Sequence, residues 1–230
     1  MEDYILGTPS RPGPEADLVQ EFVGLTLPEP QNEQHRLVFI EPLIETTRPD
    51  IVLVDWDPSV ASTWPSQRRF LKRVDLRIAQ LLLAKGSLTE AQLKIHFPRR
   101  LNASLARLEK AAVTVHRSGQ WTLRSLNDIF AVRRIVTFEA KISALSKALE
   151  QAHFNTWFSS ESYILTPVRR PSAKVLEQAR LRGVGFWSFS RDLQYKPLVT
   201  AKTYALPQSF ASWLFNEWVW KTSTETKNVN

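Results

Sequence analysis

Residues 75–123 constrain the fold most strongly, because several independent local signals follow one another there in a fixed order. An apolar segment over 75–85 is typical of a helix, and Gly86 stands where a glycine C-cap is expected. Thr89 is a suitable N-cap for a second helix over 90–97. The sequence therefore predicts two short helices joined by a tight connection.

A third helix and a hairpin complete this segment. The helix is predicted over 100–112, and one of its faces carries Leu101, Leu105 and Leu108. Residues 113–123 are typical of two short strands joined by a turn at Ser118 and Gly119. Helices followed by a two-stranded wing form a winged helix-turn-helix, which we predict for residues 67–124.

The positive charge of the chain is concentrated in the same segment. The whole sequence has a net charge of +7, and residues 67–124 hold 13 Lys or Arg against 3 Asp or Glu. Residues 1–66 show the reverse, with 3 basic and 12 acidic residues. Such a concentration predicts a polyanion partner, most often nucleic acid. A solvated basic face, or a winged helix that binds protein, is the alternative.

In a helix-turn-helix the recognition helix enters the major groove of DNA. The predicted third helix and its N-terminal edge carry the candidate DNA-binding residues Arg99, Arg100, Asn102, Ser104, Arg107 and Lys110. The wing and its flank add Arg117, Gln120 and Arg124. Arg and Asn match the edges of guanine and adenine, so duplex DNA is the expected partner.

On either side of this segment, predicted strands and helices alternate. The predicted strands cover 36–45, 50–57, 162–166 and 183–189, and a further buried strand follows a helix or loop within 126–138 and ends in 139–141. The first two are expected to form a hairpin, or at least to be adjacent strands. The predicted helices cover 15–23, 143–158 and 172–182. We expect a mixed α/β fold whose discontinuous core comprises 1–66 and 125–206, with the winged helix inserted between them.

The two ends of the chain differ from this core. Residues 1–14 are rich in Pro and Gly and are expected to form an arm. A tryptophan-rich part, 207–230, contains a predicted helix over 208–220 that is apolar on nearly all sides, which indicates burial. This helix is expected to pack on the core or to form a homodimer interface, and 222–230 is expected to be disordered.

The composition excludes several classes of protein. None of the 230 residues is Cys, which removes disulfides, thiolate zinc sites and cysteine nucleophiles. The 7 glycines are not clustered as a phosphate-binding loop requires. Neither a secretory signal nor an apolar run long enough to span a membrane is visible, so a cytoplasmic location without membrane contact is expected.

Glu139 and Lys141 follow an apolar predicted strand at alternate positions, so they are expected on one face of it. A carboxylate beside an ammonium at the end of a buried strand is costly to desolvate, which suggests a function. Asp50, at the start of an earlier predicted strand, offers a second carboxylate. Such oxygen ligands suit Mg²⁺ or Mn²⁺, and Lys141 could steady a water or a phosphate. The alternative is a salt-bridged strand end.

The pattern resembles the PD-(D/E)xK nuclease superfamily, to which restriction endonucleases and Holliday-junction resolvases belong. The resemblance lies in Arg-Pro-Asp at 48–50, Glu-Ala-Lys at 139–141 and the α-β-β-β-α-β order. It implies a restriction-endonuclease-like core in which Asp50 and Glu139 bind Mg²⁺ or Mn²⁺ and Lys141 is the catalytic lysine. The two carboxylates are 89 positions apart, which exceeds the usual connection, and the predicted insertion accounts for the difference.

The resemblance also implies auxiliary residues. Gln151, on the helix after Lys141, would contact the phosphate or a metal-bound water, and an acidic residue of the first helix, Glu15 or Glu21, would assist.

The choice of metal ligand on the second predicted strand stays open. Asp55 and Asp57 share one face of that strand, whereas Asp50 belongs to the other, and either set could face Glu139. Asp50 is favoured because Pro49 precedes it and an apolar run follows it.

These observations predict a metal-dependent DNA endonuclease that hydrolyses phosphodiester bonds and binds DNA through a winged helix. Nucleases of this kind serve, for example, in restriction or phage defence. Two alternatives stay open: a catalytically silent nuclease fold that binds DNA as a regulator, and a structure-specific nuclease that recognises branched nucleic acid.

Overall fold

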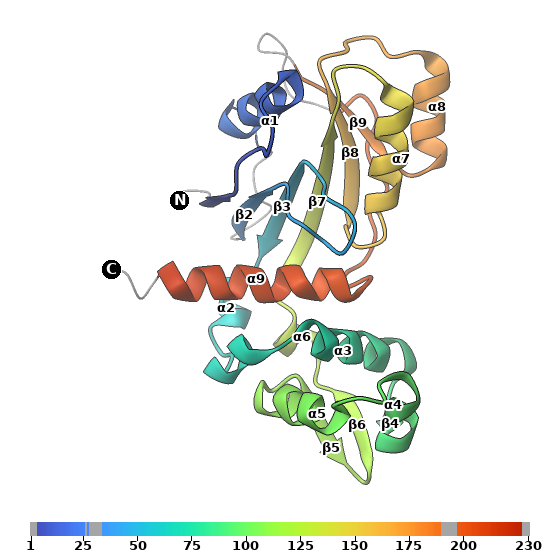
Figure 1. Ribbon diagram of the computed structural model, residues 1–230. Coiled ribbons are helices and arrows are strands. Elements are labelled where there is room, and N and C mark those ends of the chain that lie inside the picture. The colour runs from blue at the N-terminus through green and yellow to red at the C-terminus, as the bar shows by residue number, and fades with distance from the viewer. Residues whose placement is uncertain (1–3, 26, 28–33, 190–196, 227–230) are drawn as a thin grey trace. The chain divides into compact units, whose positions relative to one another are not determined.

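Figure 1 shows a computed structural model of the chain, which describes residues 4–25, 27, 34–189 and 197–226. The chain divides into two compact units. The first unit comprises Met1–Asp55 and Arg133–Gln208, and the second comprises Trp56–Val132 and Ser209–Asn230. The second unit thus extends beyond 67–124 on both sides and includes the tryptophan-rich helix.

A mixed six-stranded sheet forms the centre of the first unit, in the order β1-β2-β3-β7-β8-β9. The strands are β1 (Tyr4–Leu6), β2 (His35–Ile40), β3 (Ile51–Trp56), β7 (Val132–Ala140), β8 (Glu161–Thr166) and β9 (Gly185–Ser188). The pairs β1 with β2, β7 with β8, and β8 with β9 are parallel. The predicted mixed α and β composition is confirmed. Within the segment 1–14, which is expected to be an arm, Tyr4–Leu6 pairs with β2 as a strand that was not predicted.

Helices cover both faces of this sheet (Figure 1). Helix α1 (Pro14–Leu25) packs Phe22 into an aromatic cluster with Phe138 and Trp187. Helices α7 (Leu145–Asn155) and α8 (Ala173–Leu181) pack on the opposite face against alternate residues such as Ile164. Alternate burial on the two faces follows from the period of two along a strand. The strand order places β3 and β7 in the middle of the sheet.

The second unit consists mainly of helices and a small sheet. Its elements are α2 (Pro58–Ala61), η1 (Ser66–Phe70), α3 (Arg73–Lys85), β4 (Leu88–Thr89), α4 (Glu90–His96), α5 (Leu101–Lys110), β5 (Thr114–Arg117), β6 (Gln120–Leu123), α6 (Leu126–Ile129) and α9 (Phe210–Thr226). The sheet has the order β4-β6-β5, with antiparallel pairs. The helices and hairpin predicted over 75–123 are present, and β4 is an addition to them.

The predicted local signals act as expected in this unit. Gly86 follows α3 with a φ of 78°, a conformation that favours glycine. Thr89 and Gln92 form a capping box at the start of α4. Ser118 and Gly119 both have positive φ at the tip of the hairpin, as a tight hairpin turn requires.

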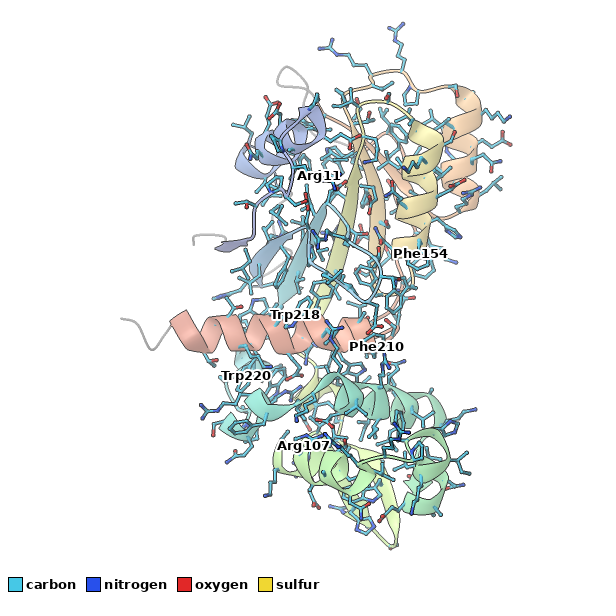
Figure 2. All side chains as sticks on the ribbon, in the orientation of Figure 1. Arg11, Arg107, Phe154, Phe210, Trp218 and Trp220 are labelled. Carbon is cyan, nitrogen blue, oxygen red and sulfur yellow. The ribbon has the colours of Figure 1, made fainter. Side chains whose placement is uncertain are left out.

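Helix α9 packs within the second unit. Its Glu217 accepts hydrogen bonds from the buried Arg68 of η1, and Asn216 accepts one from the N–H of Ala131. Phe210 lies under the guanidinium of Arg77 on α3 (Figure 2). The helix continues to Thr226, so the prediction of disorder from residue 222 is wrong for 222–226, and 227–230 lie outside the described residues.

In the part of the chain that the structure describes, no helix is both long enough and apolar enough to cross a membrane.

Candidate active site

Two carboxylates lie at adjacent strand ends in the middle of the first unit. Asp50 stands directly before β3, and its Oδ2 accepts a hydrogen bond of 2.7 Å from the backbone N–H of Ala140, the last residue of β7. Glu139 stands one residue earlier on β7 and is only 2% exposed. The structure therefore brings Asp50 and Glu139 together, although 89 residues separate them in the sequence.

Asn155 and Thr47 hold Glu139 in place. The amide Nδ2 of Asn155, at the end of α7, donates a 2.7 Å hydrogen bond to Oε1 of Glu139. Thr47 Oγ1, in the loop between β2 and β3, lies 3.3 Å from Oδ1 of Asn155. A tight turn, in which Ile44 and Thr47 exchange two backbone hydrogen bonds, sets the position of Thr47. This chain of hydrogen bonds was not predicted.

Lys141 faces the first helix as well as the carboxylates. Its Nζ lies 2.8 Å from Oε2 of Glu15, on the first turn of α1, and also donates to the carbonyl of Ala140. Glu15 is one of the two acidic residues considered on this helix.

The electrostatics show that negative charge is crowded at this point. Burial and the charge of Asp50 together raise the pKa of Glu139 to about 8, against the opposing effects of Asn155 and Lys141. Burial likewise raises the pKa of Asp50 to about 6, despite the Ala140 N–H and Lys141. Burial lowers the pKa of Lys141, but the Glu15 hydrogen bond and the neighbouring carboxylates outweigh it, so that the net pKa is raised. Lys141 is therefore held as a cation.

Gln151 belongs to the same side of α7 as Asn155, since one helical turn separates them. Its Oε1 is buried and has no hydrogen-bond partner among the described residues. A buried amide oxygen without a partner is costly, and it is a potential acceptor for a water or another ligand.

Asp55 and Asp57, the alternative ligands, have other partners. Asp55 is buried and receives two hydrogen bonds of 2.6 and 2.8 Å from the guanidinium of Arg36. Asp57 caps α2, because its Oδ1 accepts the N–H of Ser59. Both are thereby committed to local structure, which leaves Asp50 as the carboxylate of β3 that lies beside Glu139.

The donor set is compatible with a hard divalent cation. Among the described residues no cluster of three or more His, Asp or Glu side chains is arranged to hold a metal ion. Mg²⁺, however, commonly uses one or two protein carboxylates and completes its octahedron with water and substrate oxygens. Two mutually repelling carboxylates, Asp50 and Glu139, fit that requirement, and a cation would relieve their repulsion.

The predicted DNA-binding residues of the second unit fall into two groups. Seven are exposed: Arg99, Arg100, Asn102, Lys110, Arg117, Gln120 and Arg124. Ser104 is 1% exposed, and Arg107 on α5 (Figure 2) makes two hydrogen bonds of 2.7 Å to the buried Asp75 of α3. Ser104 is therefore internal to the unit, whereas Arg107 is partly exposed and its guanidinium is paired with Asp75.

Comparison with known proteins adds no assignment. No family model, no curated protein and no solved structure matches the chain. The carboxylates at the ends of β3 and β7 are therefore the basis on which a function can be proposed.

Proposed function

We propose that the chain is a metal-dependent DNA endonuclease with a restriction-endonuclease-like core. The observation that carries the proposal is the pair formed by the buried Glu139 and Asp50, with the cationic Lys141 beside it. Structural carboxylates are normally paired with a cation, as Asp55 is with Arg36. Glu139 instead lies beside a second carboxylate, Asp50, whose negative charge adds to burial in raising the pKa of Glu139. A binding function explains this cost.

Each residue has a defined part in phosphodiester hydrolysis. Asp50 and Glu139 would hold Mg²⁺ or Mn²⁺, which when bound supplies a Lewis acid that activates water at neutral pH. Lys141 donates to a non-bridging oxygen of the scissile phosphate and so stabilises the charge that develops there. Glu15 keeps Lys141 protonated and positioned. Asn155 fixes the orientation of Glu139, and Gln151 offers its buried Oε1 to a water.

The second unit supplies the proposed grip on DNA. Its order of helix α3, strand β4, helices α4 and α5, and hairpin β5–β6 supports a winged helix. In that fold α5 would enter the major groove, with Arg99, Arg100 and Asn102 at its exposed N-terminal edge. Arg117 and Gln120, near the tip of the hairpin, would contact the sugar-phosphate backbone of the DNA.

A cleavage assay tests the proposed function directly. Purified protein is incubated with supercoiled, linear and branched DNA in Mg²⁺, in Mn²⁺ or in EDTA. We expect cutting in either metal and none in EDTA, and the preferred DNA form shows whether shape or sequence directs it. Failure to cut any of these substrates, with duplex binding retained, would favour a silent nuclease fold that binds DNA.

One feature favours that silent alternative. Oε1 of Glu139 already accepts the Asn155 amide, and Lys141 is already paired with Glu15, so both groups have partners without a substrate. In an active enzyme, the metal would bind the carboxylate oxygens of Glu139 and Asp50 that do not accept these hydrogen bonds, Oε2 and Oδ1.

DNA affinity is expected to depend on the exposed arginines of the second unit. Arg100→Ala combined with Arg117→Ala should weaken duplex binding and reduce the slope of log K against log salt by about 0.9, since Arg117 is the proposed phosphate contact of the two. Arg107→Ala is the matched control. It should leave the slope nearly unchanged but destabilise the unit by about 1–3 kcal/mol, because the buried Asp75 loses its partner. An unchanged slope in the double variant would contradict the proposed grip.

A further inference from the structure

A second polar feature of the first unit lies away from the carboxylates. A cavity of about 380 Å³ opens where α7 ends, where α8 connects to β9 and where residues 200–204 pass. Its lining includes four basic or imidazole side chains: His153, Arg180, Arg182 and Lys202. None of the described residues that line it is acidic. We call this cavity the basic pocket. His153 of its lining directly precedes Phe154, which Figure 2 labels near the end of α7.

Backbone contacts fix the walls of the basic pocket. The N–H of Lys202 donates to the carbonyl of Gly183, and the N–H of Tyr204 donates to the carbonyl of Ser160. Gly183 has a φ of +68°, and a Cβ there would lie 2.9 Å from the Tyr204 hydroxyl and 3.1 Å from Cβ of Lys202. Only glycine permits this close approach, which brings Lys202 and Tyr204 next to Arg182.

The cations of the basic pocket are not neutralised within the described residues. Arg180, Arg182 and Lys202 make no ion pair with a described carboxylate, and Lys202 instead lies 5.0 Å from the ring of Tyr204. A neighbouring cavity of about 460 Å³, also lined by Tyr204, differs because its Arg134 is paired with Glu161 at 2.7 Å. The basic pocket therefore retains its positive charge for a ligand.

We propose that the basic pocket binds a phosphate group, and that in the proposed nuclease this phosphate belongs to the DNA backbone. Arginine is suited to phosphate because its planar donors match two oxygens at once. The ring of Tyr204 and the 73% exposed Leu181 add apolar surface for the sugar or base next to the phosphate. The identity of the ligand as DNA rests on the proposed function, whereas the affinity for phosphate does not.

Duplex binding in EDTA tests the proposal without involving cleavage. The variant combines Arg182→Glu with Lys202→Glu, and the control, which reverses the same charge outside the pocket, combines Arg170→Glu with Lys174→Glu. Anisotropy of a short labelled duplex should show at least a tenfold loss of affinity for the pocket variant, and a salt slope reduced by about 1.8. The control should lose much less. The exposed single substitution Arg180→Glu gives a smaller loss if the double variant folds poorly.

Thermal unfolding with inorganic pyrophosphate distinguishes the two possible ligands of the basic pocket, a phosphate of the DNA backbone and a free phosphate compound. Pyrophosphate should raise the Tm of the wild type relative to sodium chloride at equal ionic strength, and the pocket variant should lose this shift. A lost pyrophosphate shift with unchanged duplex affinity would assign the pocket to a free phosphate compound. If the pocket variant matches the control in both measurements, the phosphate site is disproved, whatever the outcome of the cleavage assay.

Discussion

At pH 8 the Glu139→Gln variant is expected to unfold at a higher temperature than the wild type while losing metal-dependent cleavage. Glu139 is 2% exposed, and its pKa is raised to about 8 by burial and by Asp50, so folding works against its ionisation. Glutamine removes the charge yet still offers a carbonyl oxygen to the Asn155 amide. We expect a gain on the order of 2–4 kcal/mol in the free energy of unfolding, which raises the Tm by several degrees.

The pH dependence of this gain has a definite sign. Below pH 4.5, the ordinary pKa of Glu, both the folded and the unfolded chain hold the proton, and the variant has no advantage. Between pH 4.5 and about 8 the folded state binds more protons than the unfolded state, so wild-type stability falls as the pH rises. Thermal scans from pH 4 to 9 should show the gap between variant and wild type widening up to about pH 8. If Glu139→Gln is less stable than the wild type at pH 8, the inference that ionisation of the buried Glu139 destabilises the folded state is wrong.

Asp55→Asn is the matched control, because it is the same kind of change on a neighbouring strand. Asp55 accepts two hydrogen bonds from the buried guanidinium of Arg36, so its removal leaves that cation without its partner. We expect a loss of about 3–5 kcal/mol. Adding Mg²⁺ should raise the Tm of the wild type and leave that of Glu139→Gln unchanged, because the proposed metal site needs the carboxylates of both Asp50 and Glu139.

Local signals in the sequence were sufficient for most of the fold. Strand and helix periods placed the main elements, and the cap residues Gly86 and Thr89 set the boundaries of α3 and α4 correctly. Strand β1 was missed because it has only three residues in a segment rich in Pro and Gly. Its pairing with β2 depends on a close approach at Gly7, where a Cβ would lie 2.7 Å from the carbonyl oxygen of Ile40, and no local pattern reports such a contact.

The residues of the candidate site that lie at strand ends could be predicted from the sequence. The side chains from distant segments that hydrogen-bond to them could not. Asp50 stands directly before one recognisable apolar run, and Glu139 stands at the end of another. Asn155 and Thr47 carry no such signal, because a helical Asn and a loop Thr are usually solvated, and their contact spans 108 residues. The burial of Ser104 could have been predicted, since it lies on the leucine face of α5.

Lys141→Ala is expected to reduce the cleavage rate by at least about 100- to 1,000-fold, the usual cost of removing a donor to the charge that develops in the transition state. DNA affinity in EDTA should fall by far less than the cleavage rate, because Lys141 is one proposed phosphate contact beside the several exposed basic residues of the second unit. Cleavage by the variant at the wild-type rate would remove Lys141 from the mechanism.

Glu15→Gln tests the role of the charge on Lys141 while the lysine side chain is kept. Glu15 raises the pKa of Lys141 through a 2.8 Å hydrogen bond and its negative charge, so Gln should lower that pKa. The cleavage rate should then decline at a lower alkaline pH than in the wild type, with a smaller loss at neutral pH than Lys141→Ala causes. Asp17→Asn is the control on the same helical turn, where no contact with the lysine exists among the described residues, and its pH profile should match the wild type. A profile unchanged by Glu15→Gln would mean that the proton of Lys141 is held by Asp50 and Glu139 alone.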